Sequence, residues 1–240
     1  MDSNRKTTRI TDISQRKAAI VAGVAYIIMF IPAIFANFFV FPNLIVPGDA
    51  ATTANNIMAS EGLFRAGIIS WLIVITCDVV FAWALYVFFK QVNKSLALFS
   101  AWFMLVHDAI LGAALINLFF GSVLLSGADN LTVFEPNQLH ALGLLFLGGF
   151  NYGFQIGLFF FSFHLGILGY LVYKSGYIPR ILSVLLIVAS FGYLINSIGR
   201  IVLPNYPEII WTVLMGLCLI GELALILWLV FKGGKGSTEG

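Results

Sequence analysis

The chain has 240 residues, of which 60% are hydrophobic and 10% are charged. Soluble domains carry about 25% charged residues, so the composition excludes a water-soluble globule as well as a disordered chain. A net charge of +2 is too small for nucleic-acid binding, which needs a clustered basic face. What remains is an integral membrane protein.

Six apolar runs are long enough to cross about 30 Å of hydrocarbon as helices, which takes about 20 residues each. They cover residues 18–41, 66–89, 97–125, 151–173, 181–202 and 209–231. We therefore expect an all-α fold, a polytopic transmembrane helical bundle of about six spanning helices. The expected domains are a basic tail at 1–17, a single helical membrane domain at 18–231 and a second tail at 232–240.

Two short helices are expected at the outer membrane interface. Asp49 follows a Pro-Gly pair and should cap a short helix that runs through Met58. Residues 136–173 carry no Asp, Glu, Lys or Arg, and as one helix they would be about 57 Å long, more than a bilayer needs. A second interfacial helix should therefore start at Pro136 and end at a break near the glycine pair 148–149.

The positions of lysine and arginine predict the orientation. Of the 13 basic residues, only Arg65 and Arg200 fall in the odd-numbered connections between spans, and the rest lie in the two tails and the even-numbered connections. By the positive-inside rule both termini are cytoplasmic. We expect a multi-pass protein whose partners are membrane lipids, and the oligomeric state stays open.

Ionisable residues inside a span are the first candidates for function, because a charge at the bilayer centre costs about 2.5–3.5 kcal/mol. Such residues are the acids Asp78, Asp108 and Glu222 and the histidines His107 and His164. Counted along their helices, they lie roughly 15–21 Å above the inner surface, in one layer. His107 is about 100° round the helix from Asp108, so only one of the two should point squarely at a given neighbour.

No lysine or arginine is expected at the depth of these acids. The acids are therefore neutral and hydrogen-bonded between helices, or share protons with the imidazoles, or neutralise a bound cation. Carboxylates with imidazoles suit zinc and related ions, which makes Asp78, Asp108, His107 and His164 candidate metal ligands. No HExxH or HxxxH spacing occurs on any span, so the sequence commits to no metal.

A second polar group lies toward the outer face and predicts an outward cavity. Its members share one stripe of the fifth span, one face of the fourth and the outer end of the second; they are Arg65, Asn151, Gln155, Tyr193, Asn196 and Arg200. Amides beneath two arginines would accept an anionic head group or a carboxylate. The alternative is that both arginines reach lipid phosphates at the membrane surface.

The fourth span carries Gly149, Gly153 and Gly157, a tandem GxxxG pattern that permits close contact with a neighbouring helix. His164 follows Gly157 by seven residues and lies within about 20° of the same helix face. We expect His164 to point at the same tightly packed neighbour.

Several stretches of the chain resemble a known group of proteins. They are residues 44–50 (LIVPGDA), 61–65 (EGLFR), 77–79 (CDV), 92–99 (VNKSLALF) and 160–186 (FFSFHLGILGYLVYKSGYIPRILSVLL). The chain resembles, over about residues 17–205, the bacterial multi-spanning membrane proteins of domain-of-unknown-function family 4386. The resemblance implies a bacterial inner (plasma) membrane protein and places Arg65, Asp78 and His164 in recurring motifs. It implies no activity, and the family tends to an acid where this chain has Asn196.

Three functions compete. The leading hypothesis is a non-enzymatic protein that binds or moves a small molecule, lipid or ion through a polar intramembrane cavity, although no inverted repeat typical of secondary transporters is visible. The alternative is an intramembrane metal-dependent hydrolase acting on lipid, in which a metal-bound water is the nucleophile. No Ser/His/Asp set and no glycine-rich phosphate loop supports an enzyme. The third hypothesis is a structural or assembly partner of a membrane complex.

Overall fold

The computed structural model describes residues 13–125, 133–203 and 205–234. Apart from short turns these residues are helical, which confirms the all-α class. The elements, in chain order, are α1 (Gln15–Ile34), the π-helix η1 (Phe35–Val40), α2 (Phe41–Leu44), α3 (Ala50–Ala59), α4 (Glu61–Leu125), α5 (Pro136–Ser175), α6 (Arg180–Val202) and α7 (Glu208–Lys232). The expected cap of α3 is present, because Asp49 Oδ1 accepts the Thr52 N–H at 2.9 Å.

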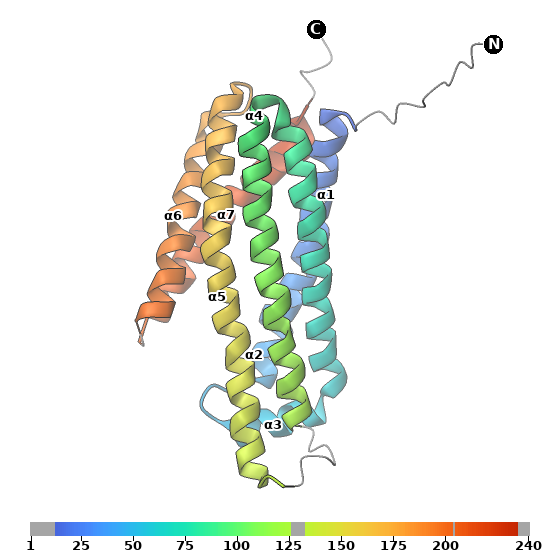
Figure 1. Ribbon diagram of the computed structural model, residues 1–240, viewed down its shortest axis with the longest axis vertical. Helices are drawn as coiled ribbons and strands as arrows, with labels where there is room; N and C mark the ends of the chain where they lie inside the picture. The colour runs from blue at the N-terminus through green and yellow to red at the C-terminus, as the bar shows by residue number, and fades with distance from the viewer. Residues whose placement is uncertain (1–12, 126–132, 204, 235–240) are drawn as a thin grey trace, which may run out of the picture.

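Five of the described helical segments are long and apolar enough to cross a membrane. The longest, α4, has 65 residues and is interrupted at Asn93 by non-helical torsion angles (φ −159°, ψ 107°). The chain reverses there, so α4 consists of two antiparallel arms, which we call arm A (residues 61–92) and arm B (residues 94–125) (Figure 1). Asn93 Oδ1 accepts the Leu96 N–H at 3.0 Å and so caps arm B. With the two arms counted separately, the segments are the six predicted spans.

The expected break near residues 148–149 is wrong, because α5 runs unbroken for 40 residues. It starts at Pro136, where Glu135 and Gln138 form a capping box, so the expected interfacial helix is the first part of α5. A glycine costs a helix only about 1 kcal/mol relative to alanine. Close packing of α5 on arm B, at Gly149 and its neighbours, offsets that cost.

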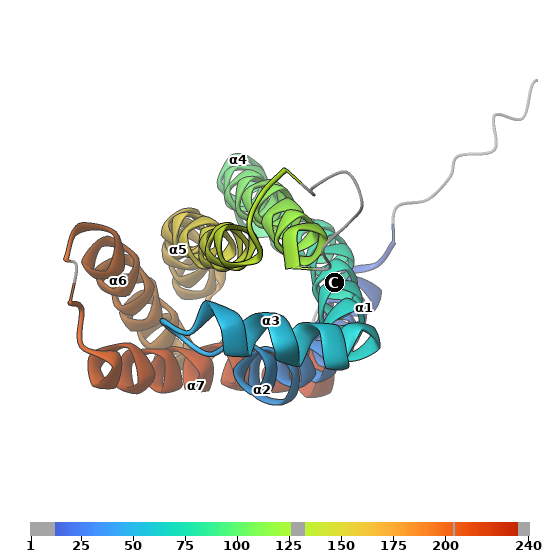
Figure 2. The ribbon, with the colours of Figure 1, turned by 90° about the horizontal axis from the view of Figure 1, so that it is seen from below.

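The helices close into a ring (Figure 2). α1 packs on α4, α4 on α5, α5 on α6, α6 on α7, and α7 again on α1. The tandem glycines Gly149, Gly153 and Gly157 face Asn117, Ala114 and His107 of arm B, respectively. The close helix contact predicted from the GxxxG pattern therefore lies within the chain.

The start of α1 and the end of α7 meet at one end of the ring, which we call the terminal end. Arg16 donates three hydrogen bonds of 2.8, 2.9 and 3.2 Å to carbonyls in and just after the last turn of α7. Gln15 Nε2 donates to the Phe88 carbonyl at 3.1 Å and to the Tyr177 hydroxyl at 2.8 Å. α3 lies at the opposite end, the α3 end (Figure 1). The cytoplasmic location of the terminal end and the domain limits at 17 and 232 stay predictions, and most of both tails lies outside the described residues.

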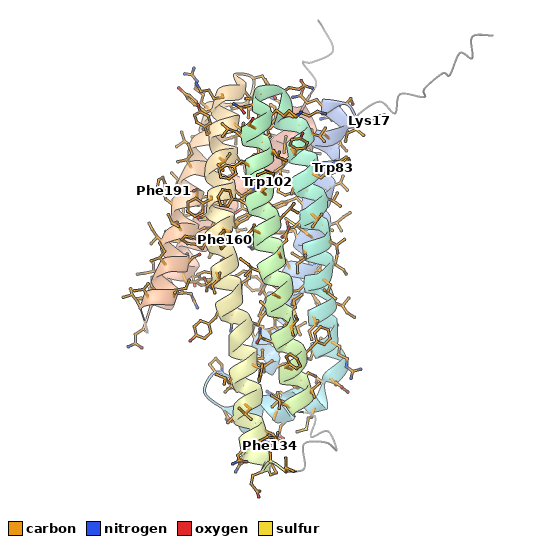
Figure 3. The ribbon with its side chains drawn as sticks, in the orientation of Figure 1. Lys17, Trp83, Trp102, Phe134, Phe160 and Phe191 are labelled. Atoms are coloured by element: carbon orange, nitrogen blue, oxygen red, sulfur yellow. The ribbon has the colours of Figure 1, made fainter. Side chains whose placement is uncertain are left out.

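Large apolar side chains cover the outside of the ring. Trp83, Trp102 and Phe191 are 48%, 55% and 59% exposed, respectively, and can be located in Figure 3. Buried ionisable side chains, by contrast, lie between the helices, Asp78 and Asp108 among them. An apolar exterior around a polar interior is what a hydrocarbon solvent requires, whereas a soluble protein rarely exposes large apolar patches.

Candidate functional site

A layer of polar side chains closes the middle of the ring, and every span contributes to it. All members are more than nine-tenths buried; they are Tyr26 (α1), Asp78 (arm A), His107 and Asp108 (arm B), His164 (α5), Tyr193 (α6) and Glu222 (α7). Each lies roughly 15–22 Å along its helix from the terminal end. We call this set the polar layer. It contains all five inner residues singled out in the sequence.

Asp78, His107 and Asp108 form the tightest group in the polar layer. Each offers one ligand atom, and the three atoms lie within 4.8 Å of one another. Both His107 and Asp108 therefore reach Asp78, although their Cα–Cβ bonds diverge by about 100°; side-chain length makes up for the angle. We call these three residues the acid–histidine cluster.

The acid–histidine cluster has more acceptors than donors. Asp78 Oδ1 and both carboxylate oxygens of Asp108 are buried without a hydrogen-bond partner among the described residues. His107 Nδ1 lies beside the backbone of Gly157, without a well-aligned hydrogen bond. Among the buried residues that the structure describes, none is a lysine or arginine. The cluster thus brings two carboxyl groups together without a buried basic partner among the described residues.

Glu222, the third acid of the polar layer, is held by two tyrosines. The Tyr193 hydroxyl donates to Glu222 Oε1 at 2.7 Å, and the Tyr26 hydroxyl donates to Oε2 at 3.2 Å. Asp78 interacts electrostatically with both Asp108 and Glu222. Both oxygens of the third acid are thus already engaged by hydroxyl donors.

His164 stands apart from the acid–histidine cluster. Its Nδ1 lies 3.0 Å from the Ser100 carbonyl oxygen, which can only accept, so Nδ1 carries the proton. The Ser100 hydroxyl donates back to the His164 carbonyl at 3.2 Å. The ring of Phe161 contacts both histidines, at centroid distances of 5.3 Å to His107 and 5.7 Å to His164. His164 points at arm B as expected, but it does not belong to the three-residue cluster.

A cavity of about 520 Å³ lies on the α3 side of the polar layer, and we call it the α3-side cavity. Its wall comes from η1, arm A, α5, α6, α7 and the connection between the last two; its residues are Asn37, Trp71, Gly148, Phe150, Asn151, Tyr152, Phe154, Gln155, Arg200, Leu203, Tyr206 and Trp211. A second cavity, of about 760 Å³, opens at the terminal end beside Gln15, Lys174 and Lys232.

The α3-side cavity includes three of the six predicted outer residues, namely Asn151, Gln155 and Arg200. Asn196 is fully buried behind the wall, where its Oδ1 accepts the Tyr206 hydroxyl at 2.6 Å. Tyr193 belongs to the polar layer instead.

Arg65 does not line the α3-side cavity, which corrects the expectation of two arginines above one site. Its guanidinium pairs with Glu61 one turn earlier on arm A, and the side chain is 66% exposed. A pair spaced i, i+4 at a helix end satisfies the arginine locally, so it has no reason to turn inward.

Aromatic rings separate the α3-side cavity from the acid–histidine cluster. The Trp71 ring contacts Phe150 and Phe154 at centroid distances of 5.8 and 5.5 Å. Trp71 precedes Asp78 by seven residues, which is two turns or about 10 Å on the same buried face of arm A. The cavity wall at Trp71 is therefore about 10 Å in depth from Asp78.

Sequence reasoning missed Tyr26, Trp71, Phe161 and Tyr206. Tyr26 and Phe161 lie in apolar runs, where an aromatic residue gives no signal of its own. Trp71 and Tyr206 become visible only when the ring brings distant spans together. The one available signal was depth, because Tyr26 lies about as far along its span as Asp78 does along arm A.

Comparison with known proteins gives a family but no activity. The family model described as "Domain of unknown function (DUF4386)" matches residues 21–233. An uncharacterized protein of Archaeoglobus fulgidus is 31% identical over 169 residues, which cover 70% of this chain and 84% of that protein. No solved structure matches the chain. The multi-pass helical membrane class agrees with the family and the five apolar helical segments, whereas a bacterial inner membrane stays a prediction.

Proposed function

Since the chain belongs to the family described as a domain of unknown function (DUF4386), a description that names no activity, we propose a function from the geometry of the polar layer. The protein binds a divalent transition-metal ion inside the membrane, with Asp78, His107 and Asp108 as ligands. The observation that carries the proposal is a compact set of buried carboxylate and imidazole groups with unsatisfied oxygens and no basic partner among the described residues.

The donor set selects the class of metal. Two carboxylates and one imidazole suit zinc and the neighbouring first-row ions, which accept mixed nitrogen and oxygen ligands. Calcium takes six to eight oxygen ligands, and magnesium keeps most of its water. Neither is served by three groups that include a histidine.

The distances are compatible with a metal after a small adjustment. Three atoms within 4.8 Å of one another share a point about 2.8 Å from each. Zinc bonds to nitrogen and carboxylate oxygen are about 2.0–2.2 Å long, so each ligand would move inward by less than about 1 Å. His107 Nδ1 faces the backbone of Gly157. Metal-bound histidines usually turn their second nitrogen to such a group.

Protons alone satisfy this cluster less well than a metal ion. Two ionised carboxylates side by side repel each other, and a protonated carboxyl needs an acceptor for its O–H. Neither oxygen of Asp108 has a hydrogen-bond partner among the described residues. One divalent ion balances the charge of both carboxylates and takes up the free oxygens.

Ion binding is favoured over lipid hydrolysis by the enclosure of the layer. Three protein ligands leave a fourth position for water, as a hydrolase requires. The void beside Glu222, however, is only about 10 Å³, which is room for about one water molecule. A lipid ester is far larger than an ion and would need a wider opening between the packed helices to reach the buried cluster.

The test is metal binding by the purified chain in detergent. Protein stripped with EDTA is dialysed against Zn²⁺ or Co²⁺, and the bound metal is counted by mass spectrometry. We expect about one ion per chain, and the visible absorption of bound Co²⁺ reports its coordination geometry. His107→Gln should weaken binding by at least about tenfold. His164→Gln is the matched control, a second buried histidine outside the cluster, and should bind like the wild type.

Wild-type protein without bound metal, or equal loss of metal in the two histidine variants, would overturn the proposal. The wild-type measurement stands even where a variant fails to fold. Reconstitution into vesicles that contain a zinc-sensitive dye then separates a carrier from a resident ion. Zinc entry that Asp108→Asn abolishes and Glu61→Gln leaves unchanged identifies a carrier.

A further inference from the structure

The α3-side cavity holds two buried polar groups that lack partners. Trp71 is 4% exposed and Gln155 is 6% exposed, and both line the cavity. Trp71 Nε1 and Gln155 Oε1 have no hydrogen-bond partner among the described residues. An indole N–H can only donate and an amide oxygen can only accept, so together they suit a group that offers both functions. A buried group left unsatisfied costs about 1–3 kcal/mol, which favours an occupant.

The charge of the cavity wall favours an anion. Among its lining residues that the structure describes, Arg200 is the one charged side chain. Its guanidinium lies 4.4 Å from the centroid of the Trp211 ring, and this stacking orients the plane of the group. A planar guanidinium pairs with carboxylate or phosphate through two parallel hydrogen bonds.

The remaining wall suits an apolar body. Phe150, Phe154 and Trp211 contribute aromatic rings, and Leu203 adds an aliphatic side chain. A volume of about 520 Å³ falls within the 300–1,000 Å³ typical of small-molecule sites, which combine apolar walls with a few placed polar groups.

We propose that the α3-side cavity binds a molecule with an anionic group on an apolar body. Arg200 binds the anionic group, and Trp71 and Gln155 bind polar atoms of the same molecule that accept and donate hydrogen bonds, respectively. No residue of the acid–histidine cluster takes part in this site, so the assignment does not rest on the metal site. Two sources share this chemistry, a free organic carboxylate and an anionic lipid.

Three probes of similar size and different charge test the free ligand. Quenching of tryptophan fluorescence is titrated with sodium benzoate, benzamide and benzylammonium chloride at constant ionic strength. We expect benzoate to bind at least about tenfold more tightly than benzylammonium, with benzamide between them. Arg200→Gln should remove the preference for benzoate, and Gln155→Leu should weaken benzamide, whose N–H can donate to Gln155 Oε1, more than benzoate, which has no donor.

The matched control is Arg65→Gln, which removes the other arginine of the α3 end from an exposed position outside the cavity. It should leave every titration unchanged. Arg200→Lys keeps the charge without the planar fork, so partial loss of benzoate binding in a variant with wild-type thermal stability supports the assignment even where Arg200→Gln unfolds.

Lipid is tested by native mass spectrometry after purification from mixed phosphatidylglycerol and phosphatidylcholine. One retained phosphatidylglycerol that Arg200→Gln removes and Arg65→Gln keeps identifies a lipid anion. Benzoate binding without retained phosphatidylglycerol identifies a free anion. The absence of both, or equal effects of the two arginine variants, overturns the proposal.

Discussion

The contact between α5 and arm B allows a stability prediction with a built-in control. A Cβ added at Gly153 would overlap the Ala114 methyl group and lie 3.4 Å from its Cα. Neither atom can rotate away, because both methyls are fixed to helical backbone. A Cβ added at Gly148, in the same helix, meets nothing within 4 Å. Both Gly148→Ala and Gly153→Ala therefore gain helix propensity, but only Gly153→Ala adds a steric overlap with Ala114.

The magnitude follows from that difference. Replacement of glycine by alanine inside a helix gains up to about 1 kcal/mol, and overpacking of a tight contact costs about 1–3 kcal/mol. Gly148→Ala should be neutral or slightly stabilising. Gly153→Ala should lie about 1–3 kcal/mol below Gly148→Ala in free energy of unfolding. SDS titration in mixed micelles, followed by far-UV circular dichroism, measures both.

A double variant tests the same contact from the partner helix. Gly153→Ala combined with Ala114→Gly removes the overlapping methyl from the partner helix, so the double variant should recover the overlap cost. Such coupling between contacting residues typically amounts to about 0.5–3 kcal/mol. Equal stability of the Gly148 and Gly153 variants, or no coupling with position 114, would show that the two helices are not in this contact.

Two further predictions concern the ends of the ring. Arg16→Gln removes charged hydrogen bonds to the end of α7 and should cost about 1–3 kcal/mol in the same SDS titration, whereas the exposed neighbour Lys17→Gln should be silent. At the α3 end, hydrogen bonds from the Thr52 side chain and backbone lower the pKa of Asp49. Its cap therefore stabilises α3 at pH above the ordinary Asp value of about 4 and is lost as the pH falls through the lowered pKa. The protection of the α3 amides, measured as their hydrogen exchange relative to the intrinsic rate at each pH, should fall below that point in the wild type but not in Asp49→Asn, which keeps a capping oxygen; unchanged protection in the wild type would contradict the cap.

Much of the fold could be predicted because a membrane simplifies the sequence code. Spans follow from the length of apolar runs, whereas the orientation expected from the alternating positive charge stays a prediction. The unbroken α5 could not be predicted in the same way. Whether a glycine pair such as 148–149 breaks a helix depends on what packs against it, and arm B is distant in sequence.

The candidate site, too, could be predicted in part. Depth along each helix brought Asp78, Asp108 and Glu222 to one level, because rise per residue is fixed. Which side chains meet at that level depends on how each helix is rotated about its own axis. That rotation brings His107 to the acid–histidine cluster and leaves His164 outside it. The prediction that Tyr193 and Arg200 belong to one outward cavity was wrong for a related reason. Tyr193 and Arg200 share one face of α6 but lie about 10 Å apart in depth, so one joins the polar layer and the other the cavity.

The two proposed sites should be coupled electrostatically, because helices of the same ring contribute to both. The proposed anion partner Arg200 lies two turns beyond Tyr193 of the polar layer on α6, so a bound anion and the layer would be about 10 Å apart in depth. A negative charge on the cluster repels an anion about 10 Å away by about 1.7 kcal/mol at an effective dielectric constant of 20, so each negative charge that zinc neutralises should tighten anion binding by a factor of roughly 17. Coupling between sites is reciprocal, so zinc should tighten benzoate binding by the factor by which benzoate tightens zinc binding. A factor of one in both titrations would refute this electrostatic coupling.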